Sequence, residues 1–98
     1  MARYMALWEV NSSKTPEDPK AKKAQWLVFQ EIVKKQLKEG VMKEWGEFAG
    51  EMSGYSICEC NAVELHTLIA AWVPFVKFKI SELLTIEEVS KATKALPD

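Results

Sequence analysis

The fold of this chain depends on the stretch VMKEWGEFAGEMSGYSICEC, residues 41–60. Side chains alternate in strand fashion over Val41–Ala49, and a second strand-like run covers Tyr55–Cys60. The connection between them, Gly50–Gly54, is short and begins and ends with glycine. Two adjacent strand-like runs with so short a link are typical of an antiparallel hairpin. The sequence therefore predicts a hairpin at the centre of the chain.

A long helix is predicted before this hairpin, over Pro19–Glu39. Proline is favoured in the first helical turn, so the helix begins at Thr15-Pro16 or at Asp18-Pro19. Gly40 follows its last residue, and glycine readily adopts the left-handed conformation that commonly ends a helix. Four apolar side chains at helical spacing form the stripe that packs on the sheet: Trp26, Phe29, Val33 and Leu37.

Two further helices are predicted after the hairpin. Asn61, with Glu64 three residues later, resembles a capping box and starts a helix that Pro74 ends. Thr85 repeats the pattern with Glu88 and opens a short C-terminal helix. The inward side chains of the first of these helices are Leu65, Leu68, Ile69 and Trp72.

Two further strands, the first and the last in the sequence, complete the pattern over Arg3–Val10 and Phe75–Glu82. The order strand, helix, strand, strand, helix, strand predicts an α+β fold of the ferredoxin-like βαββαβ type. Such a fold has a four-stranded antiparallel sheet with two helices on one face, here followed by the short C-terminal helix. We expect one domain over residues 1–98.

The second face of this sheet is expected to be open and rich in aromatic residues. From alternation we assign one set of side chains to the helix side: Met5, Leu7, Met42, Phe48, Cys58, Val76, Phe78 and Ile80. The open side then carries Tyr4, Trp8, Trp45, Tyr55, Ile57 and Phe75, mixed with Lys43, Glu47, Glu59, Lys77 and Lys79. A monomer with so many exposed aromatic side chains would be prone to association. We therefore expect a homodimer formed through the open sheet face.

Composition excludes several classes of protein. The chain has 98 residues, 48% hydrophobic and 28% charged, which is ordinary for a folded domain. Its formal net charge is −1 and it has no basic stripe, so we expect no nucleic-acid partner. Charge interrupts the apolar start, Met1–Glu9, too early for a signal peptide or a membrane span. The expected location is therefore the cytoplasm, with no membrane partner.

The two cysteines, Cys58 and Cys60, lie on one face of a predicted strand. Their Cα atoms are about 6 to 7 Å apart in an extended chain, which disfavours an ordinary disulfide. We interpret them as small buried residues, because a metal pair would need further ligands and none is evident. No metal or other cofactor is expected.

Two motifs give the chain a family resemblance. The first is Arg3-Tyr4-Met5-Ala6-Leu7-Trp8-Glu9, and the second is Trp72-Val73-Pro74-Phe75-Val76-Lys77-Phe78-Lys79-Ile80. With these motifs the chain resembles the dimeric α+β barrel superfamily, and within it a family of small proteins without an assigned activity. The superfamily includes muconolactone isomerases, cofactor-free monooxygenases and haem-degrading enzymes. The resemblance implies a dimer with a cleft between helices and sheet or a cavity between the sheets, and it transfers no catalytic residue.

The predicted binding site is a cavity on the open face, since apolar walls with a few polar groups are typical of small-ligand sites. Its residues are Tyr4, Trp8, Lys43, Trp45, Tyr55, Phe75 and Lys77. We expect a noncatalytic homodimer that is structural or binds a small aromatic or planar molecule. The alternatives are that these residues only fill the dimer interface, or that the protein is a cofactor-independent isomerase or monooxygenase acting on a small aromatic substrate. The candidate catalytic residues would then be His66, Glu59 and Tyr55, with Glu47 as a further carboxylate.

Overall fold

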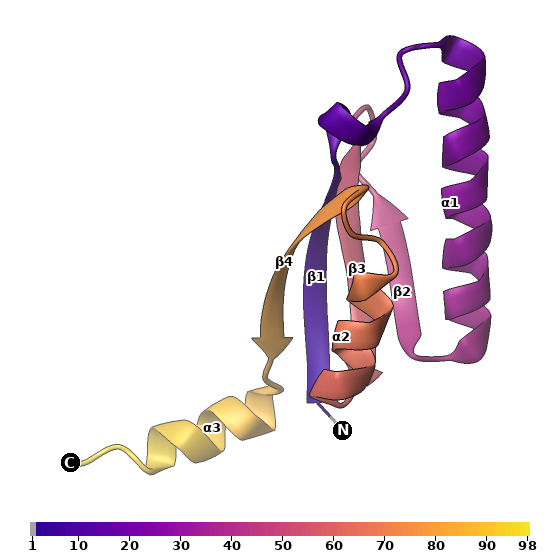
Figure 1. Cartoon of the computed structure of the whole chain (residues 1–98). Coiled ribbons are helices and arrows are strands. Elements are labelled where there is room, and N and C mark those ends of the chain that lie inside the picture. The colour runs from indigo at the N-terminus through magenta and orange to yellow at the C-terminus, as the bar shows by residue number, and fades with distance from the viewer. Residues whose placement is uncertain (1) are drawn as a thin grey trace.

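The computed structural model describes residues 2–98; Met1, the first residue of the predicted domain, lies outside them. The described chain is a small α+β fold with a four-stranded antiparallel sheet in the order β2-β3-β1-β4 (Figure 1). The elements, in chain order, are β1 (Ala2–Val10), a short 3₁₀ helix η1 (Ser12–Lys14), α1 (Pro19–Glu39), β2 (Met42–Glu47), β3 (Ser53–Cys60), α2 (Ala62–Ala70), β4 (Val76–Leu83) and α3 (Ile86–Lys94). The predicted order of strands and helices is confirmed, and η1 is an addition to it.

The predicted helix starts and the end of α1 are confirmed, whereas α2 ends at Ala70, before the predicted end at Pro74. Asp18 caps α1, its carboxylate accepting a hydrogen bond from the amide of Ala21, so the second of the two proline starts is the one used. Gly40 ends α1 with φ of 88°, in the left-handed region that favours glycine. Asn61 and Thr85 each form a complete capping box with the glutamate three residues later.

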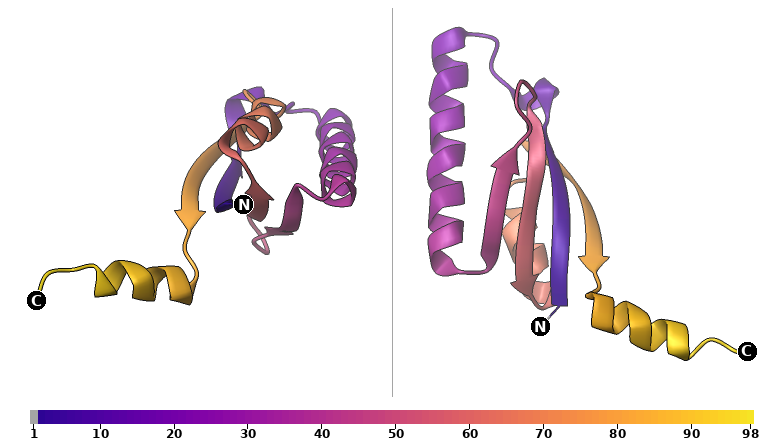
Figure 2. Two further views of the ribbon diagram at one scale, coloured as in Figure 1. Left: turned by 90° about the horizontal axis from the view of Figure 1, so that it is seen from below. Right: turned by 180° about the vertical axis from the view of Figure 1, so that it is seen from behind.

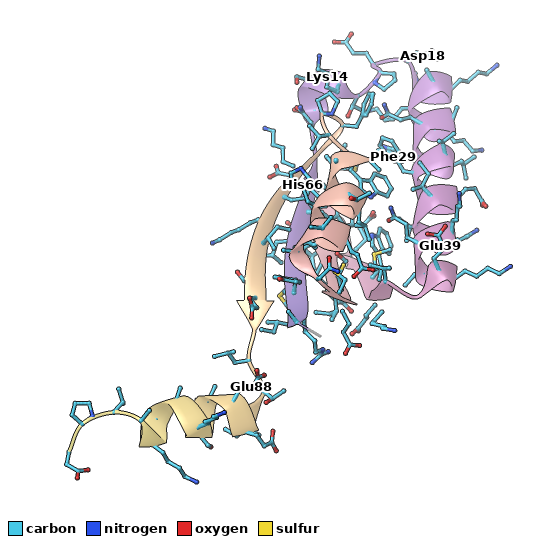
Figure 3. All side chains as sticks on the ribbon, turned by 60° about the horizontal axis from the view of Figure 1, so that its bottom comes forward. Lys14, Asp18, Phe29, Glu39, His66 and Glu88 are labelled. Atoms are coloured by element: carbon cyan, nitrogen blue, oxygen red, sulfur yellow. The ribbon has the colours of Figure 1, made fainter. Side chains whose placement is uncertain are left out.

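Helices α1 and α2 cover one face of the sheet (Figure 2). The core between them is built from buried side chains of all four strands and both helices: Trp8, Val33, Met42, Cys58, Cys60, Leu65, Trp72 and Val76. Phe29 points from α1 toward α2 and packs edge-on against Trp72, with the ring centroids 5.4 Å apart (Figure 3). Both cysteines are buried and free, as expected.

The assignment of faces in β1 is wrong. Ala6 and Trp8 face the helices and are 0% and 7% exposed, whereas Leu7 faces the open side and is 40% exposed. Tyr4 also packs against the helix-side core, and Met5 lies on the open side with Leu7. Both alternating sets of this strand are apolar, so alternation alone gives no preference for either face.

The predicted face of Trp45 is also wrong, because β2 contains a β-bulge. Met42 pairs with Cys58 and Glu44 with Ile57, so Lys43 is the extra residue on β2. The bulge shifts the alternation by one residue and places Trp45 and Glu47, both predicted on the open face, on the helix side together with Met42. Strict alternation had predicted opposite faces for Met42 and Trp45.

Two aromatic residues next to the strands are also on the side opposite to the prediction. Phe48 stacks on Tyr55 of the open face with the ring centroids 6.4 Å apart, and Phe75 contacts Phe29 of α1 at 6.1 Å. The position of Phe48 follows from the reversed alternation after the bulge, whereas Phe75 precedes β4, where strand alternation does not apply. The helix-side positions of Met42, Cys58, Val76 and Phe78 and the open-side positions of Tyr55 and Ile57 agree with the prediction.

Helix α3 stands apart from the other elements. It follows β4 and projects away from the sheet (Figures 1 and 2), and the described chain is 61 Å long but only 26 and 21 Å across. Ile86 and Val89 of α3 and Leu96 just beyond its end are 72%, 43% and 65% exposed. A nine-residue helix is only marginally stable by itself in water and usually needs packing against the rest of the protein. The exposed apolar side chains show that α3 has no such packing within this chain.

Candidate functional site: an aromatic cleft between α1 and the sheet

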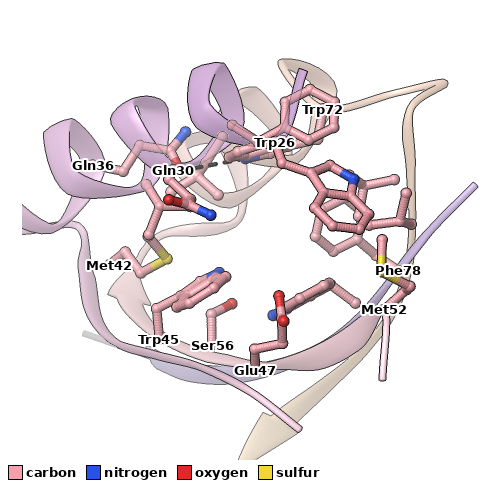
Figure 4. Close-up of a pocket in the computed structure, with 16 residues that line it drawn as sticks. Trp26, Gln30, Gln36, Met42, Trp45, Glu47, Met52, Ser56, Trp72 and Phe78 are labelled. Carbon is pink, nitrogen blue, oxygen red and sulfur yellow. Dashed lines mark hydrogen bonds between the residues drawn. The ribbon is translucent and has the colours of Figure 1, made fainter. Parts of the chain in front are cut away.

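A cavity of about 100 Å³ lies between α1, α2 and the helix-side face of the sheet (Figure 4). All four tryptophans of the chain line it, together with two phenylalanines. The aromatic lining is Trp8, Trp26, Phe29, Trp45, Trp72 and Phe78, the aliphatic lining Val10, Val33, Met42, Met52, Leu68 and Val76, and the polar lining Gln30, Gln36, Glu47 and Ser56. Apolar walls with a few polar groups are the usual composition of a small-molecule site.

The sheet side of the cleft is a flat aromatic wall. The indole rings of Trp8 and Trp45 stack with their centroids 5.2 Å apart and their planes at 10° to each other. Trp8 is held in place because its Nε1 donates a hydrogen bond to the carbonyl of Tyr55 at 3.3 Å. Ser56, which pairs with Trp45 across β2 and β3, also lines the cleft.

On the helix side of the cleft, a hydrogen bond joins α1 to the turn that follows α2. The indole Nε1 of Trp72 donates a hydrogen bond to Oε1 of Gln36 at 3.3 Å (Figure 4). Trp26 comes from an earlier turn of α1, and its Nε1 is buried without a hydrogen-bond partner among residues 2–98. A buried donor without a hydrogen-bond partner lowers the stability of the folded protein.

Two polar side chains point into the open space of the cleft. Figure 4 shows the carboxylate of Glu47 directed from the sheet side and the amide of Gln30 directed from α1. Glu47 is the one charged side chain in the lining, counting residues 2–98, and the cleft therefore carries a formal negative charge.

The structure brings together only part of the predicted binding set. Trp8 and Trp45 line the cleft, while Tyr4, Lys43, Tyr55, Phe75 and Lys77 do not. Lys43 is the exposed bulge residue, and Lys77 and Tyr55 lie on the open face. Sequence reasoning missed Trp26 and Trp72 as site residues because helical spacing predicts only that they face the sheet. A usable signal was present in β3, whose helix-side residues Gly54, Ser56, Cys58 and Cys60 are all small.

The three candidate catalytic residues lie apart from the cleft. The hydroxyl of Tyr55 donates a hydrogen bond to Oε1 of Glu44 at 2.7 Å on the open face, and this bond raises the pKa of Tyr55. The carboxylate of Glu59 lies 3.9 Å from Nε of Arg3, and His66 is exposed on α2 (Figure 3). Within the described part of the chain, no group of three or more His, Cys, Asp or Glu side chains is placed to hold a metal ion.

Comparison with known proteins assigns the chain to a family. The fold and the cleft define a small α+β domain with one aromatic site. The model of the family described as a domain of unknown function, DUF3303, matches residues 2–97, and the chain belongs to this family. No curated protein matches the chain. Within residues 2–98, no helix combines the length and the apolar character needed to cross a bilayer.

Proposed function

We propose that this protein is a noncatalytic module that binds a small aromatic or planar molecule in the cleft between α1 and the sheet. The supporting observation is that all four tryptophans, from β1, α1, β2 and the end of α2, line one cavity. Stacked and edge-to-face aromatic pairs stabilise each other by about 0.5 to 1.5 kcal/mol, and a planar ligand gains the same contacts. The cavity of about 100 Å³ is smaller than an engineered cavity of about 150 Å³ that holds benzene, so the ligand is limited to about one ring, part of which would lie at the mouth of the cleft.

Binding is favoured over catalysis by the position of the ionisable groups. A general base must lie within hydrogen-bond reach of the substrate, and His66, Glu59 and Tyr55 do not line the cleft. The cofactor-independent enzyme remains the alternative, and it would have to act through Glu47. Turnover of a small aromatic substrate that is lost in Glu47→Gln, with the fold intact, would support the enzyme instead.

Benzyl alcohol, a neutral single-ring compound, is the probe for the binding proposal. We expect saturable shifts of the indole N–H resonances in a nitrogen–proton correlation spectrum, with the backbone amides of α3 unchanged as an internal control. Trp45→Ala should weaken binding about tenfold by removing half of the stacked wall. The control Leu27→Ala removes a 51% exposed side chain of α1 and should leave binding unchanged. Shifts spread evenly over the surface would contradict the proposal.

We also propose that the chain is a ferredoxin-like subunit of a dimeric α+β barrel, paired through the open sheet face. Two observations support a second copy as the partner. The face without helices exposes apolar side chains, with Leu7 40% and Phe48 41% exposed. Ile86 and Val89 of α3, with Leu96 just beyond its end, form an exposed apolar stripe that a second copy would cover. Closed symmetric dimers are the commonest way in which a chain buries such self-complementary surfaces.

Light scattering over a range of concentrations down to about 1 µM, where weak dimers dissociate, tests the pairing. A species of twice 11.2 kDa is expected, and a monomer throughout would overturn the proposal. The cleft lies within one chain, so ligand binding and pairing are tested separately.

We further propose the cytoplasm as the location, since two free cysteines suit a reducing compartment, and cell fractionation would test it.

A further inference from the structure

We infer that the cleft selects a positively charged ligand, an organic ammonium ion carrying one aromatic ring, over neutral and anionic analogues. The inference rests on the proposed function and adds the charge of the ligand. It is carried by the combination of four tryptophans with a single charged side chain, Glu47, in one lining.

The aromatic walls favour a cation. The faces of aromatic rings carry negative electrostatic potential, and a cation within about 6 Å of a ring centroid is attracted to it, most strongly by tryptophan. Here indole rings come from both sides of the cleft: Trp8 and Trp45 from the sheet, Trp26 from α1 and Trp72 from the end of α2. An ammonium group among them would lie next to indole rings on more than one side.

The position of Glu47 adds an ionic contact beside this wall. Glu47 follows Trp45 by two residues on β2, and both lie on the helix side, where they pair with Gly54 and Ser56 of β3. Side chains two apart on a strand stand about 6 to 7 Å from each other on the same face. A cation over the ring of Trp45 is therefore within reach of the carboxylate, which Figure 4 shows directed into the cleft.

The same lining disfavours an anion. No lysine, arginine or histidine is among the described lining residues, so a ligand carboxylate would find no counterion. It would be repelled by Glu47 and by the faces of the indole rings. The amide of Gln30, an uncharged donor that points into the cleft, suits a neutral acceptor on the ligand.

Three one-ring probes of similar size test the charge preference by calorimetry: phenethylammonium, benzyl alcohol and phenylacetate. We expect the dissociation constant of phenethylammonium to be about tenfold lower than that of benzyl alcohol, and phenylacetate to bind most weakly. Added salt should weaken binding of the ammonium ion and leave the alcohol unchanged.

Glu47 is an exposed residue at the edge of the cleft, so Glu47→Gln should weaken phenethylammonium binding about twofold to fivefold and leave benzyl alcohol unchanged. The matched control is Glu44→Gln, which removes a carboxylate from the same strand but on the open face, and it should change neither constant. Equal affinities for the three probes, or an unchanged ammonium constant in Glu47→Gln, would overturn the charge preference while benzyl alcohol binding upholds the proposed function. Failure of all three probes to bind would overturn both.

Discussion

The indole rings of Trp8 and Trp45 stack at 5.2 Å although their strands, β1 and β2, are not neighbours. Strand β3 lies between them. Its residue Gly54 pairs with Trp8 of β1, and its residue Ser56 pairs with Trp45 of β2. Because these two residues have almost no side chain, the two rings extend over β3 and meet above it. The flat wall of the cleft is thus a consequence of small residues on the strand beneath.

Gly54→Ala should disrupt this wall. A Cβ at this position would lie 2.5 Å from Cζ2 of Trp8 and would also collide with the carbonyl oxygen of Gly46. We expect the free energy of unfolding to fall by about 1 to 3 kcal/mol, the usual cost of overpacking. Chemical denaturation measures the loss, and near-ultraviolet circular dichroism should show the displaced indole. The control Ser53→Ala, on the neighbouring position of the opposite face, should change stability by less than about 0.5 kcal/mol. Wild-type stability and spectrum in Gly54→Ala would contradict the packing described.

Gln36→Ala should destabilise the fold through Trp72. The indole Nε1 of Trp72 would lose its acceptor, and Trp72 is only 7% exposed. A buried donor left without a partner costs about 1 to 3 kcal/mol, and we expect the lower end because the bond is partly buried. Thermal or chemical unfolding tests this, with Lys35→Ala as the control one position away on the exposed side of α1. Equal stability of the two variants would show that this hydrogen bond does not hold α1 to α2.

The thiols of Cys58 and Cys60 should be protonated and slow to react in the folded protein. Burial raises the pKa of both thiols; the neighbouring Cys60 raises that of Cys58 further, and Glu64 that of Cys60. As pH rises, the thiols of the unfolded chain ionise before those of the folded protein. The stability that the protonated thiols contribute is therefore complete below about pH 9 and is lost as pH rises through the pKa values of the folded protein. Labelling with a thiol-specific disulfide reagent near pH 8 should be slow without denaturant and fast with it. Labelling of the native protein at the rate of a free thiol would refute this.

Val89→Lys should weaken the proposed dimer without unfolding the subunit. Val89 lies in the exposed apolar stripe of α3, so a charge there adds no strain within one chain. We expect the dissociation constant from light scattering or sedimentation to rise by about tenfold or more. Ala95→Lys adds the same charge at the opposite side of the helix end and should leave the constant unchanged. Identical constants for the two variants would remove α3 from the interface.

Local sequence predicted the elements well because their signals are short-range. The Asp18 cap, the Gly40 end and the two capping boxes each depend on residues within one turn, and the structure contains all of them. The hairpin between β2 and β3 follows similarly from a short glycine-containing link.

The candidate site was predicted less well because it depends on register. Two of its predicted residues, Trp8 and Trp45, line the cleft, but both had been assigned to the opposite face of the sheet. In β1 the two alternating sets are equally apolar, and in β2 the bulge at Lys43 reverses the alternation. In both strands the pairing with β3 decides which face each side chain occupies. This pairing joins residues far apart in the sequence, such as Trp8 and Gly54.

The sequence by itself determined the order of strands and helices, where each of the three α-helices begins and where α1 ends, because capping and turn formation are local interactions. Only the tertiary structure decided which face of the sheet each tryptophan occupies and that all four meet in one cleft. That choice depends on the space above Gly54 and Ser56 and on the contact between Gln36 and Trp72, which exist only once distant segments have packed together.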